Sequence, residues 1–240
     1  MAIRSLCWMQ RSCGCLSLTN SSGSSEHTPL PIRSIVDAHA LSGGRYIVNG
    51  DHRTREAAGY PLHLIELRSG RIVRSFGSQD AELQRGQNST QDRVMAAVRA
   101  GRVWIGHRYE YVLEQWDTTG QLHRRFRRNV DWFQLRTGSA GLSAADQPPR
   151  PILRRLFDAD SLLWVVINVA DSRWREAIRP RGTIGGMQVN RADETRYRDS
   201  IIDIVDLRTN ALIVSIKLDE LVHDITADGI PGHVPGSGVW

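Results

Sequence analysis

Four arginines surround one phenylalanine at residues 124–128, and this cluster is the part of the sequence where binding chemistry is most easily imagined. His123 precedes the cluster, and Trp132 and Phe133 follow it. Arginines interleaved with aromatic residues can follow a nucleic-acid backbone and stack on its bases. The same residues would also suit the outer strand of a β-sheet, because charged side chains protect an exposed sheet edge. We favour the outer strand, so nucleic acid is not an expected partner.

Four aspartates could provide acid–base or metal chemistry: Asp158, Asp160, Asp203 and Asp206. Asp158 and Asp160 flank a predicted hairpin turn, where aspartate is favoured because it hydrogen-bonds to nearby backbone. Asp206 belongs to a turn that recurs along the chain. We therefore expect structural roles for all four and assign no metal ligand.

No spacing of residues in the chain matches a catalytic or cofactor-binding motif. The eight histidines are scattered, and neither a His-Glu-x-x-His pattern nor a Gly-x-Ser-x-Gly elbow occurs. The glycine-rich run at residues 182–186 lacks the Lys-Ser/Thr of a phosphate loop. Because the three cysteines, Cys7, Cys13 and Cys15, all lie near the N-terminus, a disulfide framework for the fold is excluded. We predict no catalytic residue and no cofactor, which argues against an enzyme without excluding one.

An arginine-rich insertion at residues 170–199 is the best candidate for a contact surface. It separates two predicted strands, and its candidate anchors are Arg173, Trp174, Arg175 and Arg181. Tryptophan and arginine dominate the hot spots of protein interfaces. We therefore predict that the insertion binds a protein or a small ligand. A disordered insertion explains the same composition equally well.

The charge of the chain says little about partners. Its formal net charge is +5, and of its 31 basic residues Lys217 is the only lysine. Such a ratio indicates a coding bias toward arginine, so the basic balance supports nucleic-acid binding only weakly. The sequence contains neither a clear secretory signal nor an apolar run of about 18 residues, so no transmembrane span is expected.

The candidate residues lie on short strands that recur along the chain. Gly70, Gly120 and Asn210 occupy one turn position, and an aromatic or aliphatic residue follows each of them six residues later, namely Phe76, Phe126 and Ile216. This turn requires a positive φ, which glycine and asparagine tolerate. The copies cover residues 35–76, 93–128 and 152–218, with an incomplete copy at 221–240.

Four antiparallel strands that repeat in this way predict an all-β, β-propeller-like array of four-stranded antiparallel blades. The chain would hold about three blades and the start of a fourth. A β-sandwich with similar hairpins is the alternative. We favour the propeller because the copies share a turn position as well as a number of strands.

Several segments resemble bacterial six-bladed β-propeller proteins of the NHL-like class: Gly101–Ile105, Trp116–Leu122, Asp171–Glu176 and Ile204–Asn210. The resemblance covers about residues 35–227. The resemblance is specific for the fold and suggests an extracytoplasmic location. Because the chain contains no catalytic motif, we predict a non-catalytic binding or interaction module whose ligand is unknown. Propeller lactonases share the broad architecture and hold a divalent metal in the central channel, so a metal-dependent, lactonase-like hydrolase is the alternative function. Their Glu, Asn and Asp ligand pattern does not match positions in this chain.

Residues 1–30 end in a Ser/Gly-rich run and predict a disordered, low-complexity leader. Residues 31–240 would then form the propeller domain. Because a closed propeller needs at least four blades, we expect either a fragment of a longer reading frame or a ring that closes by self-association. We favour the fragment.

Overall fold

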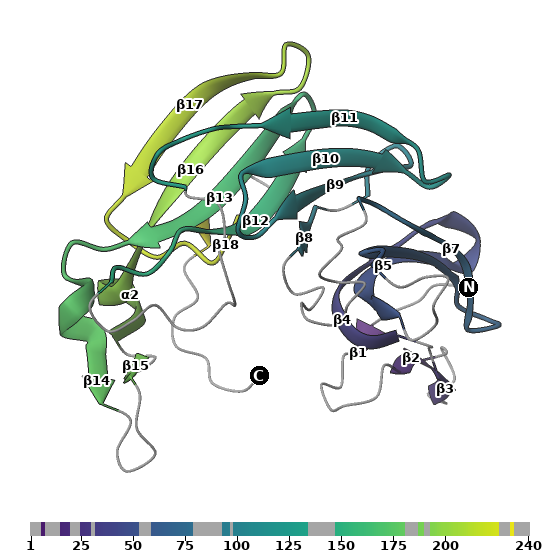
Figure 1. Ribbon diagram of the computed structural model, residues 1–240. Helices are drawn as coiled ribbons and strands as arrows, with labels where there is room; N and C mark the ends of the chain where they lie inside the picture. The colour runs from purple at the N-terminus through teal and green to yellow at the C-terminus, as the bar shows by residue number, and fades with distance from the viewer. Residues whose placement is uncertain are drawn as a thin grey trace. The chain divides into compact units, whose positions relative to one another are not determined.

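A computed structural model describes the backbone of 165 of the 240 residues: 6–7, 15–19, 25–29, 32–52, 59–78, 93–96, 98–133, 147–180, 187–189, 193–225 and 231–232. The chain divides into two compact units, and each is described by itself. The first unit contains residues 1–103, 114–124 and 239–240, and the second contains residues 104–113 and 125–238. Most described residues lie in three four-stranded antiparallel sheets (Figure 1).

The first sheet joins four consecutive strands in the order β4-β5-β6-β7. These are Ile32–Ala40, Arg45–His52, Leu62–Glu66 and Arg71–Phe76. Strand β6 is buried along most of its length because apolar side chains point to both of its faces. One core cluster contains Ile32, Ile35, Tyr46, Val48, Ile65 and Leu67.

The middle sheet has the order β11-β10-β9-β8, again in sequence order. Its strands are Arg93–Met95, Arg102–His107, Val112–Asp117 and Leu122–Arg127. Trp104 and Trp116 are buried, and Phe126 is half-buried with its ring 6.2 Å from that of Tyr111. Strand β11 is an edge strand, which is the place that the arginine cluster at 124–128 indicates.

The third sheet has the order β12-β13-β16-β17. Its strands are Ile152–Ala159, Leu162–Ala170, Arg198–Asp206 and Ala211–Leu218. Strands β13 and β16 are adjacent although the insertion separates them in sequence, and their pairing runs without interruption from Leu162–Asp206 to Ala170–Arg198. The insertion therefore leaves and re-enters the sheet at one end of the same strand pair.

The recurring turn has the predicted backbone conformation in all three sheets. Gly70, Gly120 and Asn210 have φ angles of 64°, 81° and 54°. Aspartates fasten two of the turns, because Asp117 accepts a hydrogen bond from the Thr119 amide at 2.8 Å and Asp206 accepts one from the Arg208 amide, also at 2.8 Å. Asp206 is thus a turn residue, in agreement with the structural role expected from the sequence.

Shorter strands lie outside the three sheets. Leu6–Cys7, Cys15–Thr19 and Ser25–Pro29 pair as β1-β2-β3 within the segment for which the sequence predicts a leader. In the region of the fourth copy, β18 (Asp224–Ile225) pairs with β19 (Pro231–Gly232). None of the helices that the structure describes is both long and apolar enough to cross a membrane.

Three separate sheets, each built from four strands in sequence order, are the blade pattern of a β-propeller. A β-sandwich would instead distribute such strands over two facing sheets. The protein is therefore an all-β, β-propeller-like array, and the sandwich alternative is excluded for the three sheets described.

Candidate functional site

The insertion in the third sheet forms a folded segment between β13 and β16 (Figure 1). It contains a 3₁₀ turn, η3 (Trp174–Ala177), the strands β14 (Ile178–Pro180) and β15 (Met187–Val189), and a single helical turn, α2 (Glu194–Tyr197). β14 and β15 pair as a hairpin. The Asp171 amide donates to the Tyr197 carbonyl at 3.3 Å, which joins the two ends of the insertion. Its described residues thus form a folded segment, in contrast to the disordered insertion that the sequence also allowed.

Three of the four predicted anchors lie together on or beside η3. Arg173 is exposed, with one guanidinium nitrogen 3.4 Å from a carboxylate oxygen of Asp171. Trp174 is buried, with 5% of its surface exposed. The Arg175 guanidinium carbon lies 4.5 Å from the centre of the Trp174 ring, in a cation–π contact. Arg181 lies outside the described residues.

The role of Trp174 differs from the one that its type suggests. A buried indole presents little area to a partner, and η3, which carries this indole, packs against α2 within the insertion. Its ring instead supports Arg175, whose side chain is exposed. The anchors that face solvent are therefore arginines, and the tryptophan positions one of them.

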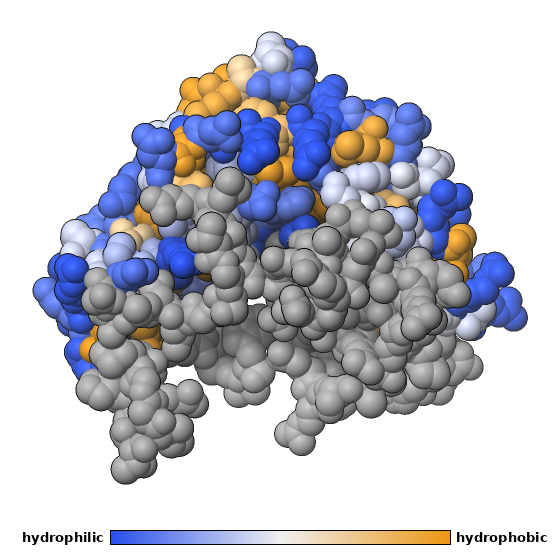
Figure 2. Space-filling view, in the orientation of Figure 1, coloured by the Kyte–Doolittle hydropathy of each residue, from blue (hydrophilic) through white to orange (hydrophobic). Residues whose placement is uncertain are grey.

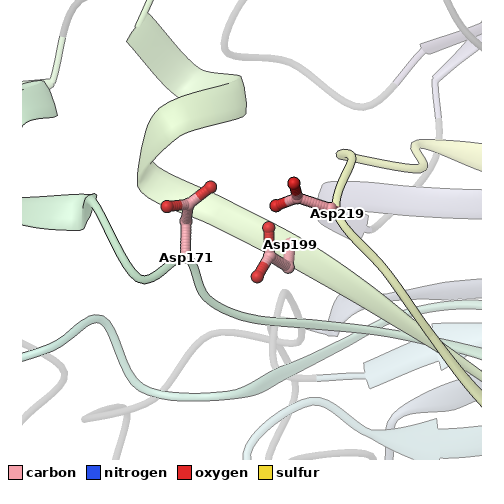
Figure 3. Close-up of side chains that lie close together, drawn as sticks. All are labelled: Asp171, Asp199 and Asp219. Carbon is pink, nitrogen blue, oxygen red and sulfur yellow. The ribbon is translucent and has the colours of Figure 1, made fainter.

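Three carboxylates meet at the base of the insertion: Asp171, Asp199 and Asp219 (Figure 3). One oxygen of each lies within 4.8 Å of the others. Asp171 and Asp199 are buried, and Asp219 is exposed. Asp171 follows β13, Asp199 is the second residue of β16 and Asp219 follows β17, so the antiparallel order of these strands brings all three to the same end of the sheet. The sequence did not identify this group. An aspartate at the end of each of the three strands was the feature that could have indicated it.

The two buried carboxylates of this cluster have opposite pKa shifts. Burial raises the pKa of Asp199, and the nearby Asp171 carboxylate adds to the effect, while Lys217 opposes it. Burial also acts to raise the pKa of Asp171, but hydrogen bonds from the Arg173 amide and guanidinium outweigh it and lower that pKa. Close like charges cannot both ionise at low cost. Asp171 therefore holds the negative charge more readily than Asp199 does.

Carboxylate oxygens are the ligands that divalent cations prefer, so this cluster is where a metal-dependent hydrolase would find ligands among the described residues. Two side-chain cations already balance the two buried acids, since Lys217 lies 2.9 Å from Asp199 and Arg173 lies 3.4 Å from Asp171. The cluster is thus accounted for as an ion-pair network that fastens the insertion to β16 and β17.

A second polar group lies within the second unit, around the buried carboxylate of Asp203. The Tyr111 hydroxyl donates to Asp203 at 2.7 Å, and Arg128 forms an ion pair with the same carboxylate oxygen. The Arg128 guanidinium also lies over the rings of Tyr111 and Trp132, at 5.7 and 5.9 Å. Arg128 is thus an internal partner of Asp203, unlike the edge-protecting residue that the sequence predicts.

An open pocket of about 440 Å³ lies beside this group. Its lining is mixed in charge, since it includes Glu110 and Asp131 as well as Arg127 and Arg128. Phe133 is buried and also lines the pocket, with its ring 5.8 Å from that of Tyr111. Because opposite charges line the pocket, its composition does not select one class of ligand.

The contact at Asp203 has a counterpart in the first unit. There the buried Glu114 accepts a hydrogen bond from the Ser78 hydroxyl at 2.6 Å. Ser78 follows Phe76 by two residues, and Arg128 follows Phe126 by two residues. In each case a donor just beyond an outer strand meets an acid on the third strand of the next sheet in the chain. Asp203 is therefore explained as a link between consecutive blades.

No protein-family model matches the sequence, and no curated protein matches it significantly. Solved structures do match. A member of the DUF4221 family from Bacteroides vulgatus aligns with a TM-score of 0.50 and 12% identity, over 86% of this chain and 61% of that one. The WD40 repeats of RRP9 align with a TM-score of 0.38 and 10% identity, over 89% and 66% of the two chains. The Dos1 propeller aligns with a TM-score of 0.40 and 11% identity, over 90% and 60%.

At these identities the likeness concerns the fold alone. The chain spans 61% of the length of the DUF4221 protein. The assignment of the fold therefore rests on the blade pattern of the three sheets themselves. The six-bladed, NHL-like resemblance is a finer statement, and it stays a prediction.

Proposed function

We propose that the protein is a non-catalytic, β-propeller-type binding module that recognises an acidic segment of a partner protein through its insertion. The observation that carries this proposal is that the side chains of two exposed arginines are held in place, Arg173 just before η3 and Arg175 within it. Asp171 holds the Arg173 side chain, and the Trp174 ring supports Arg175. An arginine that is already ordered loses less entropy on binding, and its planar guanidinium matches a carboxylate in a two-pronged hydrogen bond.

The burial of the insertion supports the same proposal. Within η3 the apolar residues Trp174 and Ala177 are buried. The exposed residues of the insertion include four arginines: Arg173, Arg175, Arg179 and Arg196. The hydrophobic residues therefore stabilise the segment, and the arginines are available to a partner. Loops held on a rigid sheet are common positions for binding residues.

The test is a titration of the full chain against a fluorescent peptide rich in glutamate, followed by fluorescence anisotropy. We expect Arg175→Ala to weaken binding about tenfold, the equivalent of roughly 1.4 kcal/mol. Arg125→Ala on β11 is the matched control, because it removes an exposed arginine from a different surface. A peptide with glutamine in place of glutamate should bind less well.

Two results would count against the proposal. One is equal weakening by Arg125→Ala and Arg175→Ala, since general electrostatic attraction would then explain the binding. The other is tighter binding of a single-stranded DNA with the same net charge than of the peptide, which would favour the nucleic-acid alternative through β11.

A further inference from the structure

Strand β17 is an edge strand of the third sheet, and its sequence is unusually apolar for that position. It pairs with β16 on one side, and no other described strand pairs with it. Its eight residues, Ala211–Leu218, include one charged side chain, Lys217, which is paired with Asp199 of its own sheet. Ile213 and Ile216 are 53% and 49% exposed. Figure 2 shows hydrophobic side chains gathered over β16 and β17.

The outer strands of the other two sheets differ from β17 in charge. Strand β7 carries Arg71 and Arg74, both exposed. Strand β11 carries Arg125 and Arg127, also exposed. Natural sheets protect their edges with such charges, because a bare edge offers unpaired N–H and C=O groups to another strand. Among these three outer strands, β17 is the one suited to accept an additional strand.

A bulge recurs in two of these strands and provides an internal comparison. Ile213 falls outside the regular pairing of β17 with β16, and Val73 falls outside that of β7 with β6. Each follows its turn residue, Asn210 or Gly70, by three positions. Val73 is 45% exposed, much like Ile213. The two positions therefore match in geometry and exposure and differ mainly in their charged neighbours.

The charges that flank β17 determine which strand would fit beside it. Arg208, whose side chain is 76% exposed, lies in the turn that precedes β17. Asp219 and Glu220, both exposed, follow its other end. An antiparallel second copy of β17 would place Arg208 of each copy near the acidic end of the other. A register centred on Val214 sets residue 208 opposite residue 220.

We infer that β17 pairs antiparallel with β17 of a second copy of this chain, so that two third sheets join into one. The strand is self-complementary in this orientation, with an apolar centre and ends of opposite charge, as a two-fold symmetric interface requires. One pair of edge strands buries less surface than a standard stable interface, so the dimer should form at high protein concentration and dissociate on dilution.

The test is sedimentation velocity on the full chain over a series of protein concentrations. We expect the sedimentation coefficient of the wild type to rise from the monomer value toward the dimer value. Ile213→Lys should raise the dissociation constant about tenfold or more, since it places a charge at the joining edge. Val73→Lys is the matched control and should leave the dissociation constant unchanged.

Charge exchange tests the antiparallel arrangement and does not touch the core. Arg208→Glu and Glu220→Arg should each weaken the dimer several-fold, and the two changes in one chain should restore it. The two positions lie at opposite ends of β17, so this rescue can arise only between copies. The inference is overturned if the wild type stays monomeric at its highest soluble concentration, if Val73→Lys acts like Ile213→Lys, or if the double variant shows no rescue.

Discussion

Asp199 and Asp203 lie on the same strand, β16, and their side chains point to the same face because successive residues alternate. Each is at most 1% exposed. Asp203 meets two donors, the Tyr111 hydroxyl and the Arg128 guanidinium. Asp199 meets one cation, Lys217, together with a second carboxylate, Asp171. The two acids are equally buried but have different neighbours. The loss of stability on removing each acid should therefore differ, because it depends on the groups that the acid contacts.

The largest expected effect follows from removing Asp203. Asp203→Ala should lower the free energy of unfolding by about 3 kcal/mol, because it leaves the Arg128 charge and the Tyr111 hydroxyl without their shared partner. Arg128→Ala should cost a similar amount, and the double variant little more than either one, since both changes break one contact. Urea denaturation measures all three. Asp131→Ala, at an exposed acid in the same unit, is the control, and an equal loss there would contradict the special role of Asp203.

The effect of Asp199 should instead be seen in the pH dependence of the free energy of unfolding. Because burial raises its pKa above the ordinary value of 3.8, the folded state holds this proton more tightly than the unfolded state. The resulting stabilisation is complete below the unfolded pKa and is lost as the pH rises through the folded one. Asp199→Asn has no such proton to lose, so its stability relative to the wild type should improve as the pH rises from the ordinary value of 3.8 through the raised pKa of the folded state.

The control for this pH dependence is Asp171→Asn. The pKa of Asp171 is lowered, with Arg173 overcoming the effect of burial, so its stabilisation is present above the unfolded pKa and lost as the pH falls. The stability of this variant relative to the wild type should therefore improve toward acid pH. If both variants moved in the same direction, the assignment of opposite shifts would be wrong.

The smallest effect is expected at the hydrogen bond from Ser78 to Glu114, which matches the Asp203 contact but has an uncharged donor. Ser78→Ala removes the hydroxyl that donates to Glu114 at 2.6 Å, but the Trp116 indole still donates to the same carboxylate at 3.1 Å. We expect a loss of about 1 kcal/mol in the free energy of unfolding, the usual value for one hydrogen bond. Ser69→Ala, at an exposed serine bonded to Glu66, should cost less. A Ser78→Ala loss as large as that of Arg128→Ala would contradict the distinction between neutral and charged links.

Much of the fold could be predicted because it depends on local patterns. The run of apolar residues from Leu162 to Val169 is typical of a strand buried on both faces, and it forms most of β13. The positive φ at Asn210 could be predicted because asparagine is one of the few residues that tolerate it. The arginine run at 124–128 likewise predicted the edge strand β11, apart from Arg128.

The candidate site was less predictable. Arg173 and Arg175 were identified from their residue types. The burial of Trp174 could not be, because it depends on the tertiary contacts of η3, such as those with α2. The cluster of Asp171, Asp199 and Asp219 escaped notice because its members are far apart in the sequence. Asp203 was expected to be structural, but its partners could not be foreseen: Tyr111 directly precedes β10 and Arg128 directly follows β11, both in a different sheet region of the chain.

The sequence by itself determined the strands, their turns and their grouping in fours, since each depends on the conformational preferences of a few neighbouring residues. Only the tertiary structure decided what the buried acids do, because the charge that an acid feels comes from residues brought near it by folding. Asp199 and Asp203 are four residues apart on one strand. They have different roles because they contact different partners, and one of these partners, Tyr111, lies 92 positions from Asp203 in the chain.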